Sequence, residues 1–462
     1  MRAKLPILLV CCMSLFIVGL DITIVNVALP TIGGDLGASI AGLQWTVAAY
    51  TVVMASLLMF SGSMADRFGR RRTFIAGLTV FAVASLLCGL APNVGVLVAF
   101  RVLQGVGASM LNPVAMAIIT NTFTDPRERA QAVGIWGAVF GIAMALGPIV
   151  GGALLAVTDW RAIFFINVPL GLAAIVLTLR FIPESRAPRP RRFDPVGQLL
   201  VIVLLATLTV GIIDEPPALV VAALALVALV RYEPRRDEPL IDLRFFRSVP
   251  FSASIVISVS AFATFGGFLF LNTLYLQQVR GLSPIGAGLA TAPMAVMVVV
   301  MAPLSGRMVG RRGPRLPLAI AGLATIVGCA MLTGLDATTP LGWLLAAYAI
   351  FGLGFGFVNA PITNAAVSGM PRAQAGVAAA IATTSRQFGQ TLGVAIVGLI
   401  VASQDGTGLA SASHPAWWTL TAGSAVVLVL GRLATAERAQ RSARRTAATL
   451  NPEALAVYAA GR

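Results

Sequence analysis

The sequence of 462 residues is 58% hydrophobic and only 11% charged, whereas soluble globular domains carry roughly 25% charged residues. This composition excludes a chain built from ordinary soluble domains and predicts an all-α polytopic membrane protein. The net charge is +15, but the basic residues form short clusters between apolar runs and do not form a basic face with interleaved aromatic residues. We therefore expect a lipid bilayer as partner and no nucleic acid.

A helix that crosses a bilayer needs about 20 mostly apolar residues, and the sequence contains fourteen such runs. The first, with Arg2 and Lys4 before it, is interpreted as a retained helix and not as a signal peptide, because it is long and contains Asp21. The seventh and eighth are the least secure, because only residues 214–217 separate them. The predicted spans are 6–29, 43–63, 73–91, 95–120, 130–155, 162–182, 196–213, 216–231, 250–271, 285–305, 315–334, 341–366, 374–402 and 416–433.

The positions of the basic residues predict an orientation for these spans. If the N-terminus lies inside, 29 of the 33 basic residues fall on inner segments, and only Arg161 and Arg280 fall on outer loops. Arg101 and Arg386 lie within spans. The excess of positive charge on cytoplasmic segments therefore predicts a multi-pass protein of the cell (cytoplasmic) membrane with both termini in the cytoplasm.

An internal repeat predicts how the spans are grouped. The loop after the second span reads GSMADRFGRR from Gly62, and the loop after the tenth reads GRMVGRRGPR from Gly306, an offset of 244 residues. Such repeats are common in secondary transporters. We predict an N-terminal six-helix bundle at 1–182, a linker region with two extra transmembrane helices at 183–248, a C-terminal six-helix bundle at 249–433 and a basic cytoplasmic tail at 434–462.

Asp21 is the only acidic residue inside a predicted span. An ionisable group in lipid costs at least about 2.5–3.5 kcal/mol and is functional by default. At 1.5 Å per helical residue, Asp21 lies about 12 Å from the outer end of its span and Arg101 about 9 Å from the outer end of the fourth. The two are therefore expected to pair, with Gln104 one turn away. A purely structural ion pair is the alternative.

Two further groups of residues, in the second loop and in the fifth span, are candidates for a role in conformational change. In the second loop, glycines permit a tight turn and Asp66 can cap a helix or pair with an arginine, so the loop is either a conformational gate or a solvated basic loop. In the fifth span, small residues permit close helix approach and a proline permits a bend, with plain packing as the alternative. The gate residues are Gly62, Asp66, Arg67, Gly69 and Arg70, and those of the fifth span are Gly147, Pro148, Gly151 and Gly152.

These motifs together resemble a known family. The second loop resembles the signature loop of the major facilitator superfamily, and Leu20–Pro30 resembles the first-helix signature of its fourteen-span drug/proton antiporters, the EmrB/QacA type. Further matching segments are Arg101–Gly107, Gly147–Gly152, Trp160–Arg161 and Phe165–Pro169. The resemblance implies the major facilitator fold with two extra central helices, a role for Arg101 and Gln104 in proton transfer, and a fifth helix that bends and slides while limiting proton leak.

Polar residues in several spans are candidates for substrate contact, because amides that face lipid are unfavourable. Interhelix hydrogen bonding is the alternative. The second loop copy has Gly310 where the first has Asp66, and no acid lies inside the spans of the second half. Neutral, monocationic or anionic lipophilic substrates are therefore favoured over dications. The candidates are Asn26, Asn272, Asn359, Arg386 and Gln387.

The sequence contains no nucleophile triad, no metal-ligand spacing and no phosphate-binding loop. We therefore predict that the chain is not an enzyme and has no catalytic residues, metal or cofactor, and that His414 lies in a polar loop without a partner. The prediction is a proton-coupled exporter of small lipophilic compounds that works by alternating access as a monomer. The alternatives are a dedicated exporter of one host metabolite and a non-transporting receptor or scaffold.

Overall fold

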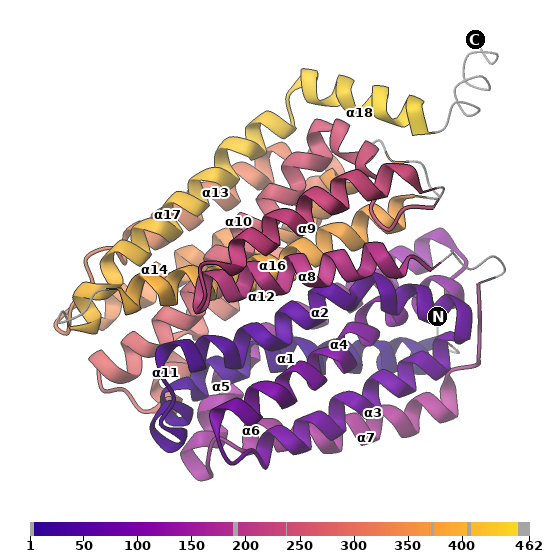
Figure 1. Ribbon diagram of the computed structural model, residues 1–462. Helices are drawn as coiled ribbons and strands as arrows, with labels where there is room; N and C mark the ends of the chain where they lie inside the picture. The colour runs from indigo at the N-terminus through magenta and orange to yellow at the C-terminus, as the bar shows by residue number, and fades with distance from the viewer. Residues whose placement is uncertain are drawn as a thin grey trace, which may run out of the picture.

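The computed structural model describes residues 4–187, 193–236, 238–368, 370, 374–403 and 408–450, and every regular element within them is a helix (Figure 1). Short polar breaks delimit the helices of the first half. Asn93 and Ser39 cap helices through their side-chain oxygens, and Gly37 and Gly69 adopt positive φ between helices. These helices are α1 (Leu5–Leu36), α2 (Ile40–Phe68), α3 (Arg70–Gly89), α4 (Val94–Thr122), α5 (Pro126–Val157), α6 (Ala162–Phe165) and α7 (Asn167–Phe181).

The second half repeats this order, and four elements stand between the halves. The intervening elements are α8 (Pro195–Ile213), α9 (Ala218–Tyr232), η2 (Glu233–Arg235) and η3 (Leu243–Arg247). The second half comprises α10 (Val249–Leu274), η4 (Tyr275–Val279), α11 (Pro284–Ala290), α12 (Ala292–Arg312), α13 (Arg315–Ala330), α14 (Leu341–Gly356), α15 (Asn359–Val367), α16 (Ala375–Ala402) and α17 (Leu409–Ala434), followed by α18 (Glu437–Leu450). Figure 1 shows the first half below the second, with α8 and α9 in front of the seam.

Within the described residues, eleven helices are long and apolar enough to cross a membrane, and α13 is a shorter apolar helix. Two further predicted spans also correspond to helices. The eighth corresponds to α9, which has 15 residues, and the thirteenth corresponds to α16, which has 28. Each predicted range therefore contains a helix, but length and composition support eleven spans, and the count of fourteen stays a prediction. The prediction that His414 lies in a polar loop without a partner is wrong. His414 lies in α17, and its Nε2 is 2.8 Å from the Leu335 carbonyl oxygen.

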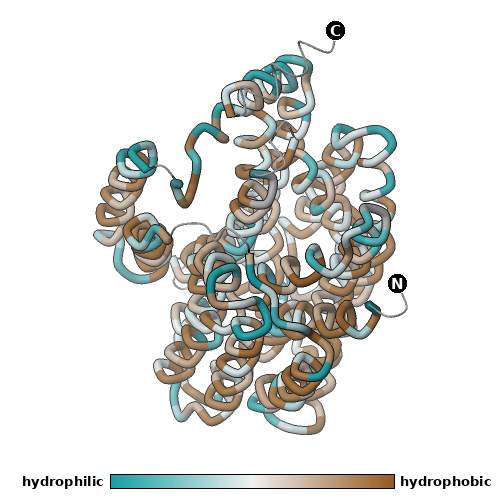
Figure 2. Tube along the Cα trace, turned by 90° about the vertical axis from the view of Figure 1, so that its right-hand side faces the viewer, coloured by the Kyte–Doolittle hydropathy of each residue, from teal (hydrophilic) through white to brown (hydrophobic). Residues whose placement is uncertain are grey.

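The outer surface of the helices is strongly apolar. Val176 of α7 is 62% exposed and Leu224 of α9 is 64% exposed, and Figure 2 shows hydrophobic colour along the outer helices. Exposed apolar area on this scale is unfavourable in water and is what a helix bundle presents to lipid tails. The buried residues instead include small and polar side chains packed between helices.

The two halves meet along α2 with α16 and α5 with α11. The Gln44 side-chain amide donates to the carbonyl oxygens of Val394 at 3.0 Å and Ala395 at 2.9 Å. A methyl group on Gly152 or Gly288 would clash with the backbone of the opposite half, so these glycines permit α5 and α11 to touch. These contacts lie toward the ends of the helices that the predicted orientation places outside the cell.

Candidate functional site

Asp21 lies at the centre of a buried polar cluster inside the first half. Arg101 Nη1 is 2.6 Å from Asp21 Oδ2, and Gln104 Nε2 donates to Asp21 Oδ1 at 2.9 Å. Arg101 Nη1 also donates to Gln104 Oε1 at 2.7 Å. The three side chains are at most 1% exposed. The structure thus brings together the three residues predicted for proton coupling, one from α1 and two from α4.

Two glycines that follow Gln104 permit α4 to approach α2 and α3 closely. A Cβ on Gly105 would lie 2.7 Å from the Tyr50 carbonyl oxygen of α2, and one on Gly107 would lie 2.9 Å from the Gly77 carbonyl oxygen of α3. Because α2 comes this close, Arg101 Nε can donate to the Thr46 carbonyl oxygen at 2.9 Å. The glycine spacing that directly follows the polar pair therefore positions the pair.

Asn167 and Ser85 complete the cluster, and the sequence reasoning did not identify either as a site residue. Asn167 Nδ2 donates to Asp21 Oδ1 at 3.0 Å, and Gln104 Nε2 donates to Ser85 Oγ at 2.7 Å. Asn167 begins α7, directly after a segment in which Trp160 donates to Asp35 near the end of α1 at 2.8 Å. The signal available in the sequence was a polar amide in the second turn of the predicted span 162–182, within the segment Phe165–Pro169.

Aromatic rings enclose the arginine. The Arg101 guanidinium carbon lies 4.3 Å from the centroid of the Tyr50 ring and 5.8 Å from that of Phe164, a cation–π arrangement. Among the residues that the structure describes, two buried polar atoms beside the cluster find no hydrogen-bond partner: the Tyr50 hydroxyl and Asn167 Oδ1. The carboxylate therefore receives three donors, while acceptor capacity remains unused next to it.

The gate loop joins α2 to α3 and contacts the segment after α7. Asp66 Oδ1 lies 3.1 Å from Arg70 Nη2, and the Arg70 amide donates to the Ser185 carbonyl oxygen at 2.9 Å. Gly69 has φ of +116°, and a Cβ there would meet the Glu184 carboxylate at 2.6 Å, so only glycine fits. Arg67 is exposed and Gly62 makes no close contact. Within the described residues, the hydrogen-bond and ion-pair partners found for this loop lie in the first half or directly after it.

The glycines of the fifth span hold α5 against both α1 and the second half. A Cβ on Gly147 would clash with Thr23, and one on Gly151 would meet the Ile24 carbonyl oxygen at 3.0 Å. A Cβ on Gly152 would lie 2.6 Å from the Pro284 carbonyl oxygen of α11. Pro148 lies inside the helix between these contacts. Any sliding of α5 therefore acts on α1 within three residues of Asp21.

The substrate candidates are spread over several helices and do not form one cluster. Asn272 accepts a hydrogen bond from the Tyr348 hydroxyl, which joins α10 to α14. Arg386 Nη2 donates to Thr363 Oγ1 at 2.7 Å, which joins α16 to α15. Asn26 donates to the Ile22 carbonyl oxygen of its own helix at 3.1 Å. Asn359 Oδ1 is buried without a partner, and Gln387 is 5% exposed.

No metal site was found in the part of the chain that the structure describes, because no three His, Cys, Asp or Glu residues gather there. Cys11, Cys12, Cys88 and Cys329 are all buried and unpaired. The site is therefore defined by a carboxylate, its arginine and amide partners.

Comparison with known proteins identifies the family. The chain is 39% identical over 412 residues to the tetracenomycin C resistance and export protein of Streptomyces glaucescens, covering 87% of this chain and 76% of that one. It is 36% identical over 407 residues to the multidrug efflux pump LfrA of Mycolicibacterium smegmatis, covering 85% and 80%.

The fold is similar to that of solved membrane transporters. A D-xylose-proton symporter superposes with a TM-score of 0.68 at 15% sequence identity, over 92% of this chain and 97% of that one. The model of the Major Facilitator Superfamily matches residues 11–394. Taken with the apolar helices, these matches make the chain a multi-pass membrane protein, and it belongs to the Major Facilitator Superfamily.

Proposed function

We propose that this chain exports small lipophilic compounds in exchange for protons. Export of small compounds is supported by relatives whose names describe resistance, export and efflux. The observation that carries proton coupling is the buried Asp21 cluster, because an ion pair at most 1% exposed is costly unless every charge is satisfied. A transporter uses such a group by changing its charge during the cycle.

Protonation of Asp21 has a defined consequence in this geometry. The neutral carboxyl loses its ion pair with Arg101, and its new O–H needs an acceptor. Asn167 Oδ1 is buried without a partner, and rotation of that amide would present the oxygen to Asp21. Asn167 can thus serve both forms of the acid, while Arg101 keeps its hydrogen bonds to the Thr46 carbonyl oxygen and to Gln104 Oε1.

The coupling follows from the packing around Asp21. Helix α5 touches α1 at Gly147 and Gly151 and touches the second half at Gly152. A change at Asp21 that alters the position of α1 therefore alters the contact between the halves. Under this proposal Asp21 takes up a proton from outside as substrate leaves, and releases it inward as substrate binds, so that the empty outward-open state does not leak protons.

The test is transport by purified protein in proteoliposomes under an imposed pH gradient. The compounds offered for transport are ethidium, puromycin and tetracenomycin C. We expect Asp21→Asn to abolish gradient-driven transport, whereas Asp35→Asn, the same change in the same helix, should retain it. Normal gradient-driven transport by the folded Asp21→Asn variant would refute proton coupling through this residue, and absence of transport by the unaltered protein with every compound would refute export of this substrate class.

We also propose the fourteen-span arrangement of the EmrB/QacA type, with domains at 1–182, 183–248, 249–433 and 434–462 and both termini in the cytoplasm. The geometry of α8 and α9 supports it. The Asp214 carboxylate accepts from Trp45 at one end of α2, while Gln198 donates to the Ser56 carbonyl oxygen farther along α2 at 2.6 Å. The Tyr232 hydroxyl, at the end of α9, donates to Asp194 at 2.9 Å. The pair thus forms a hairpin that returns to its starting level.

Cysteine labelling tests this topology in intact cells, because the four native cysteines are buried. A membrane-impermeant maleimide should label Glu215→Cys and should leave Arg236→Cys unlabelled until the cells are opened. Labelling of both, or of Arg236→Cys alone, would contradict the two extra spans. We further propose that the transporter works as a monomer.

A dedicated exporter of one compound is the second candidate, because the name of the tetracenomycin C resistance and export protein refers to a single compound. Susceptibility profiles distinguish the two. Cells that express the chain should resist chemically diverse compounds if it is a multidrug exporter, and this resistance should disappear with a proton uncoupler. Protection against one chemical class only would favour the dedicated exporter.

A further inference from the structure

The last described helix, α18, is amphipathic and lies on the second half of the protein. Its small residues Ala439, Ala443 and Thr446 are buried. The Ser442 hydroxyl oxygen accepts from the Val249 amide at 2.9 Å, which caps the first residue of α10. Leu450 packs against the cluster that contains Phe245 and Phe251. A composition rich in arginine and alanine would otherwise favour solvent, so these contacts hold α18 in place.

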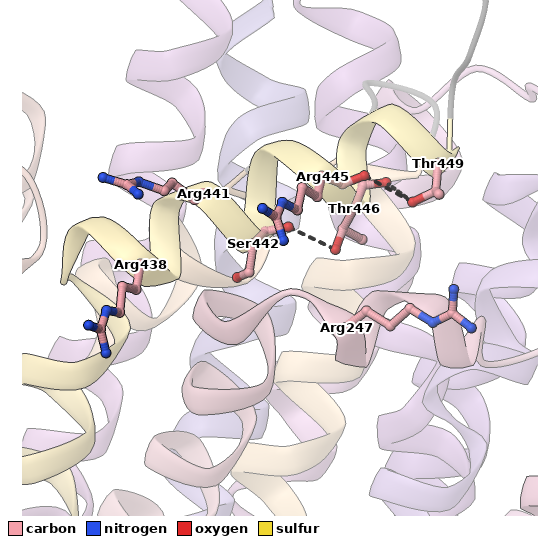
Figure 3. Close-up of a pocket in the computed structure, with 7 residues that line it drawn as sticks. All are labelled: Arg247, Arg438, Arg441, Ser442, Arg445, Thr446 and Thr449. Carbon is pink, nitrogen blue, oxygen red and sulfur yellow. Dashed lines mark hydrogen bonds between the residues drawn. The ribbon is translucent and has the colours of Figure 1, made fainter.

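A basic groove runs between α18 and η3, with a volume of about 500 Å³. Figure 3 shows its lining side chains, which on α18 recur every three or four residues and so share one helical face. The lining residues are Arg247, Arg438, Arg441, Ser442, Arg445, Thr446 and Thr449. All four charged residues of the lining are therefore arginines.

The arginines of the groove are poorly neutralised within the described part of the chain. Within the described residues, the ion pair found for these four arginines joins Arg441 to Glu437 at 3.7 Å, and that glutamate is 90% exposed. An exposed pair of this kind contributes little. Guanidinium groups present planar forks of N–H donors that match phosphate oxygens. The hydroxyls of Ser442, Thr446 and Thr449 donate to backbone carbonyls, so the arginines determine the ligand.

Apolar side chains beside the groove indicate a lipid and not a free phosphate. Phe246 and Val249 flank Arg247 and Ser248 in sequence and are 42% and 43% exposed. The groove lies at the start of α10, where that helix leaves the apolar layer. A phospholipid would place its phosphate among the arginines and its acyl chains against these exposed apolar residues.

We propose that the groove between α18 and η3 binds the phosphate of an anionic phospholipid headgroup. The site ties the end of the second half to the membrane surface. Its location in the cytoplasmic leaflet rests on the proposed orientation, but the binding chemistry does not depend on transport.

The experiment titrates the full chain, purified in detergent, with dioctanoyl phosphatidylglycerol and counts bound lipid by native mass spectrometry. The Arg438→Gln/Arg441→Gln/Arg445→Gln variant should bind the lipid at least about tenfold more weakly, because each basic residue near an anionic surface contributes on the order of 1 kcal/mol. The control Arg307→Gln/Arg311→Gln/Arg312→Gln removes the same charge from exposed positions of α12 and should change the affinity less than about twofold.

Further arms identify the ligand and exclude misfolding. The triple arginine-to-lysine variant keeps the charge but loses the planar forks, so it should bind the lipid more tightly than the glutamine variant and more weakly than the unaltered protein. Inorganic phosphate and dioctanoyl phosphatidylcholine should not displace phosphatidylglycerol at equal concentration, and Phe246→Ser should weaken lipid binding. Equal affinity of both glutamine triple variants, or full displacement by inorganic phosphate, would overturn the proposal, and neither outcome bears on proton-coupled export.

Discussion

The two helical bundles have the same helix order and very different interiors. In the first, Asp21, Arg101, Gln104 and Asn167 form a charged network between α1, α4 and α7. In the second, the corresponding space holds aromatic rings. Phe265 stacks on Phe355 with centroids 4.2 Å apart.

The repeat offset makes the comparison specific. At 244 residues, Asp21 corresponds to Phe265 and Gln104 corresponds to Tyr348. Phe268, one turn from Phe265, stacks on Phe351 at 4.3 Å and meets Trp417 edge-on at 5.7 Å. The Tyr348 hydroxyl donates to Asn272, a neutral bond. Charge change is therefore available in the first bundle, while the second offers a stiff apolar interior, so the repeat preserves helix packing and not chemistry.

The largest expected effect comes from moving the acid to the other bundle. Phe265→Asp would remove a stacked ring and bury a carboxylate where Leu345 occupies the position that corresponds to Arg101. We expect a loss of more than about 5 kcal/mol of unfolding free energy, or no folded protein. Gel filtration and thermal denaturation in detergent measure this, with Phe265→Leu as the control that keeps an apolar side chain. A stable Phe265→Asp variant would show that the bundles are interchangeable.

The second effect tests the pair in its native place. Arg101→Leu leaves Asp21 buried without its cation, and we expect a loss of about 3–5 kcal/mol. The double variant Asp21→Asn/Arg101→Leu should recover part of this loss, because no uncompensated charge remains. Denaturant titration of purified protein gives both values. If the single and double variants are equally unstable, packing and not charge pairing dominates the site.

Another buried acid, outside both bundles, sharpens the contrast. Glu233 of η2 is fully buried, and burial, followed by the nearby Asp194, raises its pKa to about 7. Arg236 and backbone donors only partly oppose this shift. The folded-state pKa lies above the unfolded value of 4.5, so the protonated form stabilises the fold. That contribution is complete below pH 4.5 and is lost as the pH rises through 7.

The measurement is the unfolding free energy between pH 5 and 8. The unaltered protein should lose up to roughly 3 kcal/mol over this range from Glu233. Glu233→Gln, which imitates the protonated acid, should remove most of that dependence, and Glu437→Gln at an exposed position should not. An unchanged pH profile in Glu233→Gln would mean that folding does not raise the pKa of this acid.

The smallest effect concerns the neutral bond of the second bundle. Tyr348→Phe removes the hydroxyl that bonds Asn272 and keeps the ring between α10 and α14. We expect a cost of about 1 kcal/mol, within the usual range for one hydrogen bond, and unchanged pH dependence of transport. Proteoliposome transport at several pH values tests the second part. A shifted pH dependence would place proton chemistry in both bundles.

Much of this protein could be predicted from local sequence. Apolar runs of about 20 residues predicted helices, because a chain segment in a bilayer must satisfy its own backbone hydrogen bonds. Each of the fourteen predicted ranges contains a helix. The lone interior acid and its arginine were predicted to pair, because they lie at similar depths and neither is tolerable alone in lipid. Gly105 and Gly107, within the fourth-helix motif, allow α4 to approach α2 and α3, and α2 supplies the Thr46 carbonyl oxygen that accepts from Arg101.

Only the tertiary structure revealed what surrounds these residues. Asn167 reaches Asp21 because α7 packs on α1, and Ser85 reaches Gln104 because α3 packs on α4; nothing in their local sequence specifies these neighbours. Asn272, a predicted substrate contact, accepts a hydrogen bond from the Tyr348 hydroxyl, and His414 lies in a helix. A hydrophobic pattern determines which segments enter the membrane, because transfer depends on each segment alone, whereas the partner of a polar group depends on which helices become neighbours.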